Sequence, residues 1–186
     1  MNLVELIQSR RTIQTYNSKP VAENLVDQAL QLAMWAPNHK LTFPWRFIKA
    51  GPEARRQLAQ LAARLKAAKS GQPPSAAQIA MLEKTYLTPS HLLILLMDQT
   101  LDAFQAREDY ASVAMGVQNM GLFLWSHQVG TKWSSGGVTS HEKTYQILQV
   151  DHNTQEIVGF LWVGYFDQSP RATERPACDG RVRSVP

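Results

Sequence analysis

The spacing of apolar residues predicts an irregular alternation of helices and strands along this chain. Apolar residues recur at helical spacing over residues 3–9, and again from about residue 22 to just before Pro37. Alternating residues over 45–50 and a continuous apolar run over 92–97 predict two strands, the second covered on both faces. Residues 156–166 form the strongest predicted strand. Other helices are predicted over about 53–69, 75–86, 108–128 and 140–148, and a short strand within 130–137.

This order of elements contains no regular strand-helix-strand rhythm, so the sequence predicts an α+β fold rather than a doubly wound parallel sheet. The 186 residues fit one domain, which we expect to span residues 1–186. Hydrophobic residues make up 44% of the chain and charged residues 18%, a composition typical of globular proteins. The polar segment that follows the last strand has little core of its own, and we expect it to pack on a partner chain.

Charge and cysteine content narrow the class of protein. The formal net charge of +4 favours anionic ligands, but no run of five or more Lys and Arg residues occurs, so we expect no nucleic-acid partner. The single cysteine, Cys178, excludes an internal disulfide framework and fits a reducing compartment. Because the first residues also lack a signal-peptide pattern, we expect a cytoplasmic protein.

One segment has the length of a membrane span. Residues 110–128 contain no Asp, Glu, Lys or Arg, which is enough to cross a bilayer. Ser112, Gln118 and Asn119 interrupt the segment, however. We therefore interpret it as a buried helix of a soluble protein, at a subunit interface, and we expect no membrane association.

Arg10, Arg11 and Thr12 form the first candidate site. Guanidinium groups offer forked donors and a permanent positive charge, and a hydroxyl beside them adds another donor, so the cluster suits a phosphate. The alternative is a solvated helix end, where arginines interact favourably with the helix dipole.

The segment between Trp35 and Phe47 is the second candidate. Pro37 and Pro44 stiffen it, and it carries His39 in a polar stretch between an apolar helix and a strand. Such a loop could hold a flat ligand, with His39 as a donor or an acid/base group, or His39 could simply lie on the surface. Tryptophans at 35, 45 and 133 could likewise stack on a ligand or belong to the core.

Other chemistry has weaker support in the sequence. Glu108 and Asp109 are adjacent carboxylates that would point apart on a helix, and we interpret them as the start of one. The sequence has no glycine-rich dinucleotide fingerprint, phosphate loop or Gly-x-Ser-x-Gly motif. No second histidine or carboxylate stands at metal-ligand spacing from His39, so we expect no metal site.

Five stretches, taken in order, resemble the flavin-dependent nitroreductase family, most closely its short members. They cover nearly the whole chain: Ser9-Arg-Arg-Thr-Ile-Gln-Thr-Tyr16; Ala33-Met-Trp-Ala-Pro-Asn-His-Lys40 with Pro44-Trp-Arg-Phe47; Glu108-Asp-Tyr-Ala-Ser-Val-Ala-Met-Gly-Val-Gln-Asn-Met120; Gly130-Thr-Lys-Trp-Ser-Ser-Gly136; and Ile157-Val-Gly-Phe-Leu-Trp-Val-Gly-Tyr165.

The resemblance implies a particular architecture and cofactor. The fold would be a three-layer sandwich, with an antiparallel-type central sheet flanked by helices, in a homodimer with an intertwined C-terminal tail. FMN would bind at each subunit interface. The implied cofactor-binding residues are Arg10, Arg11 and Thr12 at the flavin phosphate, ribityl chain and ring edge, Trp35 and His39 from the second subunit, and Trp133, Ser134 and Ser135 along the flavin.

The implied reaction transfers a hydride from NAD(P)H through flavin N5 to an oxidised acceptor such as a nitroaromatic or a quinone. The flavin carries the chemistry, so no side chain is assigned a catalytic role. Two alternatives stay open. One is another flavin reaction on the same fold, desaturation or ring fragmentation; the other is a flavin-binding module without turnover.

Two positions depart from the family pattern. Gln14 stands where relatives often have a cation near the pyrimidine edge of the ring, and Ser134 follows Trp133 where an arginine is frequent. Both changes remove positive charge that would stabilise reduced flavin, so they affect the expected flavin potential.

Overall fold

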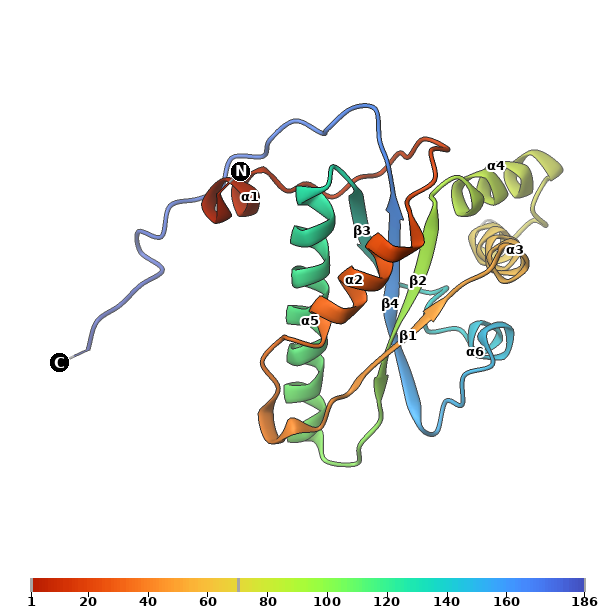
Figure 1. Ribbon diagram of the computed structural model, residues 1–186. Helices are drawn as coiled ribbons and strands as arrows, with labels where there is room; N and C mark the ends of the chain where they lie inside the picture. Colours follow the sequence, from red (N-terminus) through yellow and green to blue (C-terminus); the bar gives the residue numbers. More distant parts are fainter. Residues whose placement is uncertain (1, 70, 186) are drawn as a thin grey trace.

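The computed structural model describes residues 2–69 and 71–185 of the chain, in which a four-stranded sheet lies between two layers of helices (Figure 1). The strands are β1 (Trp45–Lys49), β2 (His91–Asp98), β3 (Gly130–Ser134) and β4 (Gln155–Gly164). The helices are α1 (Leu3–Ser9), α2 (Glu23–Ala33), the 3₁₀ helix η1 (His39–Leu41), α3 (Pro52–Ala68), α4 (Ala76–Leu87), α5 (Ala103–Ser126) and α6 (Glu142–Leu148).

The strands pair in the order β1-β2-β4-β3, and each pairing is antiparallel. Successive side chains of a strand point to opposite faces, and β2 is apolar on both. Its residues 93, 95 and 97 pack in a core with α2 and α5, while 92, 94 and 96 pack in a second core with α3 and α6. This confirms the prediction that residues 92–97 form a central strand covered on both faces.

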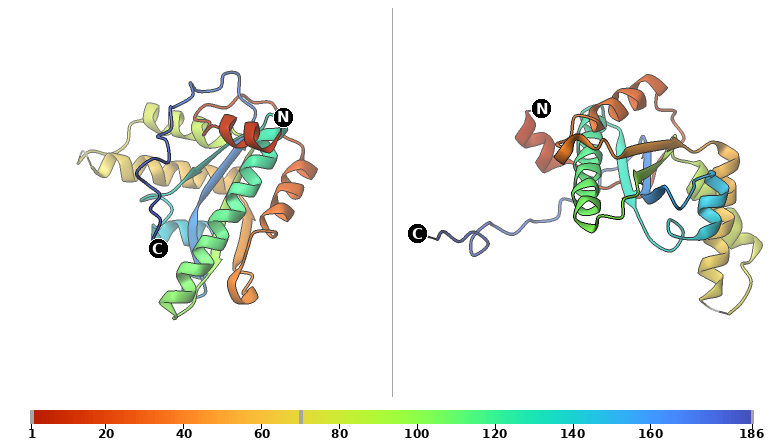
Figure 2. Two further views of the ribbon diagram at one scale, coloured as in Figure 1. Left: turned by 90° about the vertical axis from the view of Figure 1, so that its left-hand side faces the viewer. Right: turned by 90° about the horizontal axis from the view of Figure 1, so that it is seen from below.

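The helices divide between the two faces of the sheet. Helices α2 and α5 lie on one side, and α3, α4 and α6 lie on the other, which the view from below shows most plainly (Figure 2). The predicted α+β fold with an antiparallel sheet flanked by helices is therefore confirmed. Gly116 permits the close approach of α5 to α2, because a Cβ at this position would lie 2.9 Å from the Ala33 carbonyl oxygen.

The start of the long helix was predicted wrongly. Helix α5 begins at Ala103, one and a half turns before the Glu108–Asp109 pair. The Asp102 carboxylate accepts hydrogen bonds from the main-chain N–H groups of Phe104 and Gln105, which caps the helix there. The Asp109 side chain is buried within the helix instead of marking its start.

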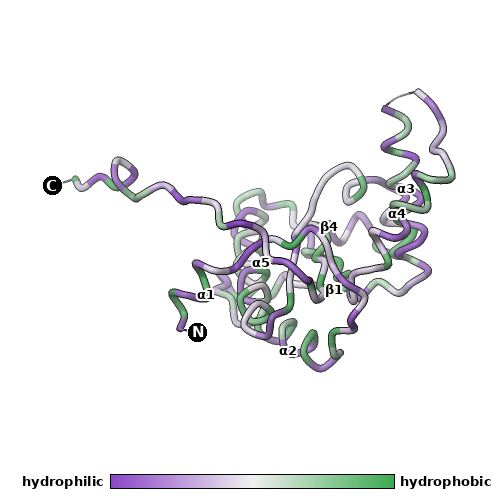
Figure 3. The backbone as a smooth tube through the Cα atoms, turned by 90° about the horizontal axis from the view of Figure 1, so that it is seen from above, coloured by the Kyte–Doolittle hydropathy of each residue, from purple (hydrophilic) through white to green (hydrophobic). Residues whose placement is uncertain are grey.

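The tail beyond β4 contains no helix or strand over residues 167–185, and it extends away from the body (Figures 1 and 3). Its side chains are exposed. Intertwining of this tail with a second chain stays a prediction. Within residues 2–69 and 71–185, no helix combines the length and apolarity needed to cross a membrane.

Candidate functional site

The chain between α1 and α2 lies along the free edge of β3. Helix α1 starts in a capping box formed by Asn2 and Glu5 and ends at Ser9, and Arg10 is its C-cap residue. The chain then extends, so that Thr12 forms a parallel bridge with Thr131 of β3 and the Ile13 N–H donates to the Thr131 carbonyl at 3.0 Å. This pairing brings the Arg10–Thr12 segment next to β3 and the second half of α5.

Arg10, Thr12 and Trp133 line one pocket of about 220 Å³. Its other walls come from α5, β3 and β4, and are formed by Val117, Gln118, Gly121, Thr131 and Leu161. Glycine at position 121 leaves room here, since an added Cβ would stand 3.6 Å from the Thr131 hydroxyl oxygen and 3.7 Å from Arg10 Cδ. The sequence predicted the first three residues as ligands; the wall residues carry no chemical signal and were missed.

The electrostatics of this pocket favour an anion. Arg10 is half-buried, and burial, together with the nearby guanidinium groups of Arg11 and Arg175, lowers its pKa. None of the ion pairs among the described residues includes Arg10. An unpaired, partly desolvated cation beside two like charges gains from binding an anionic group.

Arg11 has a different environment from Arg10. Its Nη1 donates to the carbonyl oxygens of Gln8 at 2.6 Å and Arg10 at 2.9 Å. Arg11 therefore donates to carbonyl groups at the end of α1. This is the structural alternative that the sequence allowed for the arginines at the end of this helix.

The segment at the end of β3 divides between the two faces of the sheet. The Trp133 indole lies against Gly159 of β4, where no Cβ intervenes, and its ring centre is 6.4 Å from that of Tyr110 on α5. Ser134 faces the other way, and its hydroxyl accepts a 2.8 Å hydrogen bond from Trp162 Nε1. Ser135 is exposed just beyond the strand. A role for Ser134 in binding would therefore involve its main chain.

The loop between α2 and β1 lies beside the first half of α5, and several of its side chains are exposed. Trp35 is 81% exposed and His39, in η1, is also exposed; neither lines the pocket that contains Arg10 and Trp133. Lys40, Leu41 and Phe43 have positive φ angles of 58°, 53° and 49°. Each such conformation in a residue other than glycine costs about 1–3 kcal/mol, so other contacts must hold this loop.

Side chains of the loop and of α5 supply those contacts, which no pattern in the sequence indicated. Asn38 donates to Ser112 Oγ at 3.2 Å and accepts from the Phe43 N–H at 2.8 Å. Thr42 Oγ1 donates to Asp109 Oδ1 at 2.5 Å, and the Asp109 side chain is only 4% exposed.

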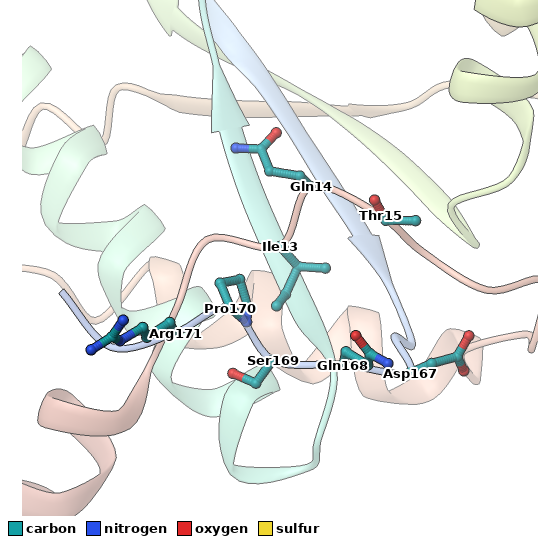
Figure 4. Close-up of a pocket in the computed structure, with 8 residues that line it drawn as sticks. All are labelled: Ile13, Gln14, Thr15, Asp167, Gln168, Ser169, Pro170 and Arg171. Atoms are coloured by element: carbon teal, nitrogen blue, oxygen red, sulfur yellow. The ribbon is translucent and has the colours of Figure 1, made fainter.

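A second, larger pocket of about 570 Å³ lies between residues 13–15 and residues 167–171 at the start of the tail (Figure 4). Gln14 lines it, and Gln14 also lines a smaller pocket of about 220 Å³ with Lys84 of α4. Lys84 therefore supplies a positive charge near Gln14, the position at which the sequence lacks the cation that is frequent in the family. Among the described residues, no group of three or more His, Cys, Asp or Glu side chains could hold a metal ion.

Comparisons with known proteins agree with one another. The model of the nitroreductase family matches residues 7–165. A Bacillus subtilis (strain 168) protein, YfhC, is 28% identical over 93% of this chain and 89% of its own length; its name assigns it provisionally as an NAD(P)H nitroreductase. A nitroreductase-like family protein from Bacillus cereus has a similar solved structure, with a TM-score of 0.87, 26% identity, and coverage of 100% of this chain and 96% of its own.

A third comparison includes a ligand. A structure from Desulfovibrio desulfuricans, provisionally described as a nitroreductase and solved in complex with FMN, matches with a TM-score of 0.76 and 19% identity, over 100% of this chain and 98% of its own. At this identity the match shows a shared fold.

Proposed function

Because this chain belongs to the nitroreductase family, we propose that it is an FMN-dependent oxidoreductase that takes electrons from NAD(P)H and passes them to an oxidised small molecule such as a nitroaromatic or a quinone. The observation that carries the proposal is the convergence of Arg10, Thr12 and Trp133 on one pocket. The FMN in the related structure of the same fold and the name of the Bacillus subtilis relative support the choice of cofactor and reductant.

The pocket residues fit the chemical groups of FMN. Arg10 offers the phosphate a guanidinium that has no carboxylate partner among the described residues. Thr12 offers a hydroxyl to the ribityl chain, and Trp133 offers a flat apolar surface. Bound FMN supplies hydride-accepting chemistry, and the side chains bind it, orient it and exclude water.

A second copy of the chain completes the site in this proposal. Trp35, Leu41 and Phe43 expose large apolar surface on the loop, and Tyr110 and Met115 expose more on α5. Exposed apolar surface of this kind is typical of interaction sites. In a homodimer, Trp35 and His39 of one copy would then cover the FMN bound beside Arg10 of the other.

The experiment is an FMN titration followed by anaerobic reduction. We expect the purified protein to bind FMN and its flavin absorbance to bleach on addition of NADPH or NADH, with recovery when a nitroaromatic or quinone is added. A protein that does not take up FMN would contradict the proposal. A yellow protein that neither nucleotide bleaches would favour one of the other flavin reactions or a binding module without turnover.

Arg10→Ala and Arg64→Ala form a matched pair of variants for this titration. Arg64 is an exposed arginine on α3, in the helix layer on the opposite face of the sheet from α5. We expect Arg10→Ala to weaken FMN binding and Arg64→Ala to bind FMN like the unmodified protein. Equal affinities for the two variants would mean that FMN does not use the pocket containing Arg10.

A further inference from the structure

The loop over residues 38–43 is held in a strained shape that buries little of its own apolar surface. Leu41 and Phe43 have left-handed backbone conformations, and both side chains are exposed. A loop that served only this chain could relax to a less strained conformation. Its shape is therefore better explained by what the loop presents to another molecule.

A short series of hydrogen bonds imposes this shape from α5. The buried Asp109 carboxylate accepts from Thr42 Oγ1 at 2.5 Å and from Gln105 Nε2 at 2.9 Å. Thr42 Oγ1 in turn accepts from Asn38 Nδ2 at 3.0 Å, and Asn38 Oδ1 accepts from the Phe43 N–H at 2.8 Å. The series thus runs from the helix to the main chain of the strained segment.

Asp109 is an unusual residue for a purely structural position. It is buried, and its hydrogen-bond donors are a neutral hydroxyl and a neutral amide; no ion pair among the described residues includes it. A buried carboxylate without a cation is costly to keep, but its hydrogen bonds are stronger than those of a neutral acceptor. That strength is useful where a strained loop must be held in one conformation.

We propose that Asp109 is a positioning residue of the FMN site. Acting through Thr42 and Asn38, it holds the 38–43 loop in the conformation that delivers His39 to the FMN site of a second copy. The proposal rests on the function proposed above. It adds a specific claim, that hydrogen bonds within one chain prepare this loop before FMN or the second copy is engaged, and so lower the cost of closing the site.

Thr42 is the best position for the test, because it is exposed and its substitution spares the core. Thr42→Val removes the hydroxyl at nearly constant shape, and Thr42→Ser keeps the hydroxyl. Thr154→Val is the matched control: Thr154 is also exposed, and its hydroxyl donates to the Asp151 carbonyl in the turn before β4.

The first measurement is hydrogen exchange of the loop amides in the FMN-free protein. We expect exchange over residues 39–43 to accelerate about 10-fold or more in Thr42→Val, the effect of losing one hydrogen bond to a charged group, and to return toward the parent rate in Thr42→Ser. Thr154→Val should leave the loop unchanged. Parent-like exchange in Thr42→Val would overturn the proposal whether or not the protein binds FMN.

The second measurement is the FMN dissociation constant, with the visible circular dichroism of bound flavin as a signature of its surroundings. We expect Thr42→Val to bind FMN about 10-fold more weakly and to alter the flavin spectrum, and Thr42→Ser to restore both. Parent-like affinity and spectrum in Thr42→Val, in a parent protein that binds FMN, would overturn the positioning role and leave the proposed function standing. A parent protein that binds no FMN would overturn both.

Discussion

Trp162 donates its indole N–H to the Ser134 hydroxyl at 2.8 Å, so the side chain of Ser134 lies on the face of the sheet opposite that of Trp133. Trp162 is buried in the core beneath α3 and α6, whereas Trp133 packs on the α5 side. The family resemblance assigns Trp133 and Ser134 to the same flavin, but their side chains lie on opposite faces of the sheet and contact different cores.

This separation predicts the effect of Ser134→Ala. The substitution leaves the Trp162 N–H without its partner in a buried site, so the free energy of unfolding should fall by about 1–3 kcal/mol. FMN affinity of the folded protein should stay within about two-fold of the parent, since no side-chain contact with the pocket is lost. Urea denaturation and flavin titration measure the two quantities. A large loss of FMN affinity with parent-like stability would place the Ser134 hydroxyl at the flavin.

Arg10 and Arg11 should respond differently to alanine substitution. Arg10 lines the pocket, and losing one charge-assisted hydrogen bond of about 1.5–3 kcal/mol should weaken FMN binding about 10- to 100-fold. Arg11 bonds the carbonyls of Gln8 and Arg10, so Arg11→Ala should mainly loosen the end of α1 and weaken binding much less. The comparison is made by fluorescence titration with FMN. Equal losses for both variants would assign both guanidinium groups to the ligand.

Arg175 is the tail residue whose charge reaches the pocket. Its proximity contributes to the lowered pKa of Arg10, which places a further cation near the expected phosphate. We expect Arg175→Ala to weaken binding of FMN and to reduce its dependence on salt, and to have a smaller effect on riboflavin, which lacks the phosphate. Arg183→Ala, farther along the exposed tail, is the control. Identical FMN and riboflavin responses in Arg175→Ala would exclude a phosphate contact.

The buried phenol of Tyr86 makes the free energy of unfolding depend on pH in the alkaline range. Burial raises the pKa of its phenol from the usual 10.0 to about 12. The folded state therefore holds this proton more tightly than the unfolded state does, and the stabilisation is complete below pH 10 and is lost as the pH rises toward 12. We expect this group to lower the free energy of unfolding by about 2–3 kcal/mol over that interval. Tyr86→Phe should show a shallower decline in chemical denaturation, and an unchanged slope would contradict this origin.

The sequence predicted the layers of the fold because buried apolar residues recur along the chain at the spacing of the helix or strand that contains them. The apolar run over 92–97 predicted a central strand covered on both faces, and the structure has it at the centre of the sheet. The start of α5 was misplaced because its cap depends on local contacts of the Asp102 carboxylate with the Phe104 and Gln105 N–H groups. In the sequence the Glu108–Asp109 pair is the more conspicuous signal of a helix start.

The site could be predicted only in part. Arg10, Thr12 and Trp133 were identifiable from their chemistry and from the family resemblance, and the structure brings them to one pocket. Successive side chains of a strand point to opposite faces, so the Ser134 side chain lies opposite that of Trp133. The prediction that residues 133–135 all lie along the flavin did not take this alternation into account. The pairing of Asp109 with Thr42 joins residues 67 positions apart, and such a contact leaves no local pattern in the sequence.

We propose that each FMN site combines Arg10 of one copy with the Trp35–His39 loop of another. Co-expression of an Arg10→Ala chain with a Trp35→Ala/His39→Ala chain tests it, because each pure homodimer lacks part of both sites. A mixed dimer regains one intact site, so random pairing should restore tight FMN binding to about a quarter of all sites. Binding no better than that of the two separate homodimers would contradict a site shared between copies.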